Sequence, residues 1–167
     1  KGRQPDVQAL AEVRALIGPR PLEGHRRDLL IEHLHALNDH YRALHRAHLV
    51  ALAHEMGIPQ AEVMEVASFY HHFEILSDGT QAPALTVRVY GGLACDMAGA
   101  ADLASRLPAL LGRDDVRVVT APCVGRCDTA PVAVVHQTPV PLATAETVLA
   151  EANRQLARVK PDTAAIN

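Results

Sequence analysis

Cysteine is scarce in this sequence of 167 residues, which contains only Cys95, Cys123 and Cys127. A small and odd number of cysteines argues against the disulfide framework of a secreted domain and favours a reducing compartment. No apolar stretch is long enough to span a bilayer, and the N-terminus shows no signal-peptide pattern. The sequence therefore predicts a cytoplasmic protein with no membrane segment.

Features that nucleic acids and nucleotide cofactors require are also missing. Basic residues form no stripe and the formal net charge is −3 at pH 7, so we expect no nucleic-acid partner. No G-x-G-x-x-G stretch follows a predicted strand, so neither a flavin nor a nicotinamide site is visible. We therefore expect that this chain alone is not a dehydrogenase.

The hydrophobic pattern predicts a helical subdomain over residues 1–73 with no strand. Apolar residues recur at helical spacing in residues 6–17, 25–41 and 43–56, and a fourth helix starts at about residue 58. Asp6 is the predicted N-cap of the first helix. Gly57 is expected to end the third helix, and Pro59 fits the first position of the fourth.

The pattern changes in residues 80–159, where strands and helices alternate. Strands are predicted at 84–90, 115–121 and 132–136, with a short edge strand at 140–142, and helices at about 98–111 and 144–159. A strand–helix–strand crossover gives parallel pairing, and the later pair forms a hairpin. The predicted class is α/β: an N-terminal helical bundle followed by a thioredoxin-like four-stranded mixed sheet with two helices. Residues 160–167 are expected to be a linker or cut terminus, and the chain a piece of a longer polypeptide.

Each cysteine-bearing loop follows a predicted strand, with Cys95 after 84–90 and Cys123 and Cys127 after 115–121. Because neighbouring parallel strands end at the same edge of a sheet, we expect the three thiols to share one site. Soft thiolates select iron–sulfur clusters, zinc or Cu(I). The plain alternative is three buried thiols without a ligand. Thioredoxin-type redox chemistry is less favoured, because it uses C-x-x-C at a helix N-terminus.

At these motifs the chain resembles the thioredoxin-like 2Fe-2S subunit of respiratory complex I and its relatives in NAD-linked hydrogenases and formate dehydrogenases. The second loop of that family reads C-x-G-x-C, as Cys123, Gly125 and Cys127 do here, with a proline soon after. An aromatic motif closes the helical part in the family, and residues 67–73 are similar to it. The resemblance runs from about residue 25 to residue 150.

The resemblance implies a ligand set of C-x4-C in the first loop and C-x3-C in the second. Cys95, Cys123 and Cys127 match three of these four ligands of a 2Fe-2S cluster. Tyr90 occupies the fourth position, and phenolate is not the usual ligand of such clusters. An imidazole of His71 or His72 is another candidate for the fourth ligand. We expect the site to hold iron poorly or not at all, with Tyr90 pointing toward the cysteines.

The resemblance also implies a role and partners. The chain would be an electron-transfer or structural module of an NAD-linked oxidoreductase complex, of the formate dehydrogenase or hydrogenase type. FMN, NAD and 4Fe-4S clusters are expected on a flavin- and NAD-binding subunit or domain, which in some relatives is fused C-terminally, and on other iron–sulfur subunits. The alternatives are a cluster-free docking domain that supports the flavin subunit, and, less favoured, a thiol redox protein.

The aromatic residues at the end of the helical part are predicted to be structural, and the histidines of this part are not predicted to bind a metal. Phe69 and Phe73 are expected to anchor the core. His33, His35, His40, His45 and His48 are close in sequence, but no acidic or thiol partner is evident to complete a zinc site, and histidines on amphipathic helices are usually solvated.

Overall fold

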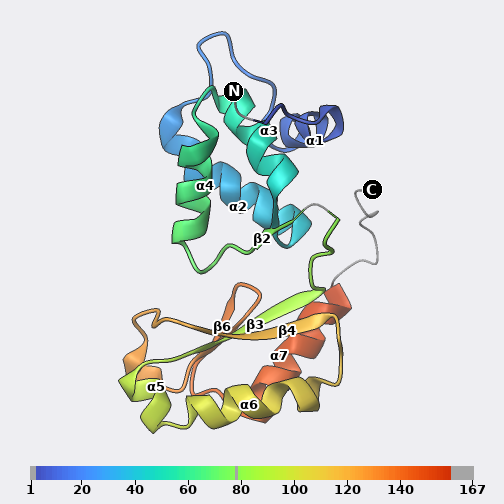
Figure 1. Ribbon diagram of the computed structural model, residues 1–167. Helices are drawn as coiled ribbons and strands as arrows, with labels where there is room; N and C mark the ends of the chain where they lie inside the picture. Colours follow the sequence, from blue (N-terminus) through green and yellow to red (C-terminus); the bar gives the residue numbers. More distant parts are fainter. Residues whose placement is uncertain (1–2, 78, 159–167) are drawn as a thin grey trace. The chain divides into compact units, whose positions relative to one another are not determined.

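The computed structural model describes residues 3–77 and 79–158, which form two compact units that divide between Ala82 and Pro83 (Figure 1). The predicted linker at 160–167 lies outside the described residues. None of the helices in the described ranges has both the length and the apolar character needed to cross a bilayer. Each unit is described by itself.

The first unit is a helical bundle, as predicted. In its described part the α-helices are α1 (Val7–Ile17), α2 (Leu30–Tyr41), α3 (Arg46–Met56) and α4 (Gln60–Phe69), with a 3₁₀ turn at Arg27–Leu29 before α2. The apolar faces of these helices bury one core that contains Val13, Leu34, Leu37, Leu49, Leu52 and Val63. Burial of each of these side chains stabilises the fold by about 1.5–3 kcal/mol and drives the packing.

Local signals fix most of the helix ends. The Asp6 carboxylate accepts hydrogen bonds from the backbone N–H groups of Gln8 and Ala9, both at 3.0 Å, and caps α1. Gly57 follows the last residue of α3, as expected. Pro59 is the N-cap of α4 rather than its first helical residue, a shift of one position from the prediction.

Two short strands in this unit were not predicted, so the expectation of no strand before residue 80 was wrong. β1 (Leu44–His45) pairs in parallel with β2 (Ile75–Leu76), and the Leu44 N–H also donates to the Glu74 carbonyl at 2.8 Å. Two residues are too few to show the alternation that identifies a strand in a sequence. Because of β1, the third helix begins at Arg46 and not at residue 43.

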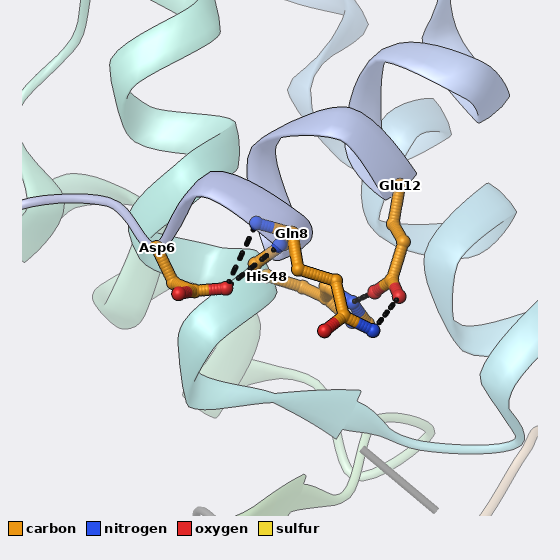
Figure 2. A network of polar contacts seen from close by, with 5 residues as sticks. Asp6, Gln8, Glu12 and His48 are labelled. Atoms are coloured by element: carbon orange, nitrogen blue, oxygen red, sulfur yellow. Dashed lines mark hydrogen bonds and ion pairs between the residues drawn. The ribbon is translucent and has the colours of Figure 1, made fainter. Parts of the chain in front are cut away.

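Polar contacts fasten α1 to α3 (Figure 2). His48 is fully buried, and its Nε2 lies 2.7 Å from Oε2 of Glu12 on α1. Gln8 donates to the other carboxylate oxygen of Glu12 at 2.9 Å. A second pair joins the same helices, because Arg14 Nε donates to Oε1 of buried Glu55 at 2.9 Å. The expectation that His48 is solvated was therefore wrong.

The second unit is built on the predicted four-stranded mixed sheet. Within residues 83–158 the strands are β3 (Leu85–Tyr90), β4 (Val116–Ala121), β5 (Ala133–Val135) and β6 (Thr138–Val140), in the order β4-β3-β5-β6. β3 is parallel to β4 and antiparallel to β5, and β5 and β6 form a hairpin. β6 begins two residues earlier than predicted, but it is the edge strand, where Pro139 costs least.

Two helices cover one face of this sheet (Figure 1). α6 (Ala100–Leu111) connects β3 to β4, and α7 (Ala145–Arg158) follows β6. Thr144 caps α7, since its Oγ1 accepts the Thr147 N–H at 3.2 Å. The buried core between these layers includes Val87, Val89, Leu103, Leu107, Val135 and Val148.

The aromatic motif at the end of the bundle is only partly internal. Phe73 is 8% exposed and belongs to the helical core, as predicted. Phe69 is 76% exposed, so its predicted role as a core anchor was wrong. It lies at the last residue of α4 and lines an open cleft with Ile31, Val66 and Tyr70.

Candidate thiol metal centre

The candidate site begins where β3 and β4 end side by side. Tyr90 and Ala121 are the last paired residues of the two strands, and the Gly91 N–H donates to the Ala121 carbonyl at 2.9 Å. Gly92 has φ of 135°, and a Cβ built on it would lie 3.8 Å from Cβ of Cys123. The loop after β3 therefore adjoins the cysteine loop after β4.

The second loop folds back so that its two cysteines meet. Sγ of Cys123 lies 3.4 Å from Sγ of Cys127, and both thiols are free and exposed. Gly125 makes this turn with φ of 78°, a conformation that favours glycine. Two thiolates bound to one tetrahedral ion, with metal–sulfur bonds of about 2.3 Å, lie roughly 3.7 Å apart. This pair therefore fits one metal ion.

Hydrogen bonds also prepare Cys123 for deprotonation. The Gly125 N–H donates to its sulfur at 3.2 Å. This contact, followed by the interaction with the Cys127 thiol, lowers the pKa of Cys123 below its ordinary value. Cys123 in turn raises the pKa of Cys127. Cys123 is thus the thiol that first becomes a thiolate, the form that binds metals.

Cys95 differs from this pair in its setting. It lies in a short helix, α5 (Leu93–Met97), and not in the predicted loop, and it is 3% exposed. Its charge contributes to the raised pKa of Cys127, so it lies nearby. Across residues 3–77 and 79–158, however, the three sulfurs do not all lie within 4.8 Å of one another. The alternative of three buried thiols is wrong, because Cys123 and Cys127 are exposed.

Tyr90, at the position where the resemblance predicts a fourth ligand, is poorly suited to bind iron. Tyr90 is 7% exposed and is part of the same buried cluster as Cys95. Burial raises the pKa of its phenol, and this outweighs the opposite influence of Arg88. Tyr90 and Arg88, two residues apart on β3, lie on the same face of the sheet. A neutral phenol is not a soft ligand, so these residues do not fit a cage of four thiolates. The orientation of the Tyr90 ring toward the cysteines stays a prediction.

Sequence reasoning did not identify two features that shape this site. Gly92 allows the first loop to approach Cys123, and its signal was the Gly91–Gly92 pair directly after a strand. α5 places Cys95 in the core, and five residues are too few for helical periodicity to reveal it.

A parallel β3–β4 pair, helices on one face and cysteines beyond the strand ends define a thioredoxin-like protein with a candidate thiol metal centre. The sequence matches the family of thioredoxin-like [2Fe-2S] ferredoxins over residues 16–153. The chain therefore belongs to this family.

Solved structures with a similar fold include an NAD⁺-reducing [NiFe]-hydrogenase, in its air-oxidized and in its H₂-reduced state. In both cases the identity is 24% and the TM-score is 0.60. The match covers 79% of this chain but only 23% of the hydrogenase chain. This likeness shows the fold, and this chain spans about a quarter of the length of that neighbour.

Proposed function

We propose that this chain is an electron-transfer or structural module of an NAD-linked oxidoreductase complex, of the hydrogenase or formate dehydrogenase type, with a degenerate 2Fe-2S site. Cys95, Cys123 and Cys127 are the candidate ligands, and Tyr90 stands in the fourth position. The partner would be a flavin- and NAD-binding subunit or domain, together with other iron–sulfur subunits. FMN, NAD and 4Fe-4S clusters would belong to these partners.

The single observation that carries this proposal is the arrangement beyond β3 and β4. The sulfurs of Cys123 and Cys127 lie 3.4 Å apart, close to the separation of two thiolates that bind one metal ion, while a buried phenol replaces the thiol expected beside Cys95. Membership of the 2Fe-2S ferredoxin family supports the proposal that the site derives from a 2Fe-2S site. The NAD⁺-reducing hydrogenase with the same fold supports the kind of complex.

Within this proposal, the cluster-free role is the one that the ligand set favours. Without a fourth thiolate, the metal ion bound by Cys95 lacks its second soft ligand, so a stable cluster is not expected. The module would then serve to hold the flavin subunit in place. The ferredoxin role would require another group to complete the cage.

The metal content of the chain separates these two roles. The chain is purified without oxygen, and iron, acid-labile sulfide and the visible spectrum are measured. We expect clearly fewer than two irons and two sulfides per chain. A full complement, with the visible absorption of a 2Fe-2S cluster, would establish the electron-transfer role and overturn the docking role.

Membership of a complex needs a separate experiment. The chain, carrying an affinity tag, is recovered from its source cells, and the eluate is assayed for FMN and for NADH-dependent reduction of an artificial dye. We expect both to accompany the chain. A chain that elutes without flavin and without this activity would refute the proposed partner, whatever its iron content.

A further inference from the structure

A second group of metal-binding side chains lies in the helical unit, well separated in sequence from the cysteines. His35 and Asp39 come from α2, and His72 comes from the segment between α4 and β2. Their ligand atoms all lie within 4.8 Å of one another. We propose that His35, Asp39 and His72 form a binding site for a divalent zinc-class ion.

The helix brings the first two ligands together. His35 and Asp39 are four residues apart, which puts both side chains on one face of α2, one turn apart. Both are exposed, so an ion can reach them from solvent. This i, i+4 spacing is the one by which paired histidines on a helix bind zinc.

A tight turn supplies the third ligand. The Phe73 N–H donates to the Tyr70 carbonyl at 3.0 Å, which closes a turn around His72. The rings of His35 and His72 are 5.1 Å apart and tilted by 40°. Two imidazoles on one tetrahedral zinc, with Zn–N bonds of about 2.1 Å, hold their ring centres roughly 5 Å apart. The two rings therefore already have the separation that a shared ion needs.

Phe73 supports both imidazoles from the protein side. Its ring is 4.9 Å from that of His35 and 5.4 Å from that of His72, with edge-on geometry in both contacts. Phe73 is itself anchored in the helical core. The contacts with this anchored ring limit the movement of the two imidazoles and so help to preorganise the site.

The donor set indicates the class of ion. Two imidazoles and one carboxylate suit zinc and neighbouring transition ions, whereas calcium and magnesium prefer oxygen ligands alone. Three protein ligands leave at least one position for water. A bound ion would join α2 to the segment after α4 and would stabilise the bundle by mass action.

The test is calorimetric titration of the full chain with Zn²⁺. Because the exposed thiol pair also binds zinc, the titration uses the variant with Cys123→Ser and Cys127→Ser. We expect one zinc per chain at the histidine site. Asp39→Asn should weaken binding at least ten-fold, which corresponds to about 1.4 kcal/mol. His40→Asn, also exposed and on α2, is the matched control and should leave the affinity unchanged.

A second readout guards against a variant that fails to fold. In NMR spectra of the variant that carries only Cys123→Ser and Cys127→Ser, zinc should shift the imidazole signals of His35 and His72 before those of His40. Equal zinc affinity in Asp39→Asn and His40→Asn would show an adventitious surface ion and overturn the proposal. Absence of zinc binding, or equal shifts at all three histidines, would overturn it as well.

Discussion

Replacing Tyr90 with cysteine is the most direct experiment on the degenerate site. The change places a soft ligand where a neutral phenol now lies, and so completes the set of four thiols that 2Fe-2S clusters use. After anaerobic reconstitution with iron and sulfide, we expect Tyr90→Cys to retain close to two irons per chain, and the wild type clearly fewer. Iron and sulfide analysis with the visible spectrum measures the gain.

The same substitution should weaken the apoprotein. Tyr90 is 7% exposed within the sheet core, and loss of a buried aromatic ring costs about 3–5 kcal/mol when replaced by a small side chain. Thermal unfolding of the iron-free variant should therefore occur at lower temperature than that of the wild type. Cluster binding to the folded state should restore part of this loss.

Tyr90→Ser is the matched control, because serine leaves a cavity of similar size but offers no thiolate. We expect it to lose at least as much stability, because a buried hydroxyl costs more than a buried thiol, and to gain no iron. If Tyr90→Cys holds no more iron than Tyr90→Ser, position 90 is not the missing ligand position. If the wild type already holds two irons and two sulfides, the reasoning about the phenol is refuted.

Three further predictions concern ion pairs and titrating groups. Arg14→Met should cost about 1–3 kcal/mol, because it leaves buried Glu55 without its charged partner; urea unfolding at pH 7 checks this. Arg14 lowers the pKa of Glu55. The stabilisation from this pair is therefore present above the unfolded-state pKa near 4.5 and is lost as pH falls below it. If the free energies of unfolding of wild type and variant differ by the same amount at pH 3 and at pH 7, this prediction is wrong. The pKa of His33 is lowered by burial and, to a smaller extent, by the neighbouring imidazole of His25. The folded state therefore loses stability as pH falls below about 6.5. His33→Gln should reduce this loss of stability between pH 7.5 and pH 5.5. Diamide, which accepts two electrons and two protons, should join Cys123 and Cys127 as a disulfide, seen as loss of two hydrogens by mass spectrometry; a Cys123→Ser variant that loses the same mass would refute this pairing.

Long periodic segments and strong local signals were predictable from the sequence. The four helices of the bundle, the Asp6 cap and the order of strands and helices along residues 83–158 all follow from apolar periodicity and from residues that act on their own neighbours. The same holds for the turn at Gly125, since the spacing of two cysteines around a glycine is a local property. These features depend on contacts within a few residues, so each is encoded where it occurs.

Other features depended on partners that are distant in the chain. β1 and β2 are two residues each and exist because Leu44 meets Ile75 in space. Phe69 and Phe73 look equivalent in the sequence, yet only Phe73 packs into the helical core.

The two candidate sites show the same division. The sequence alone determined that each cysteine-bearing loop follows a predicted strand and that residue 90, the expected fourth ligand position, is a tyrosine. Only the tertiary structure decided that Cys123 and Cys127 pair in the open while Cys95 is buried. It also brought His72 to His35 and Asp39 across more than thirty residues of chain. Apolar periodicity specifies which face of an element is buried, but polar groups converge only when the packed elements fix their positions.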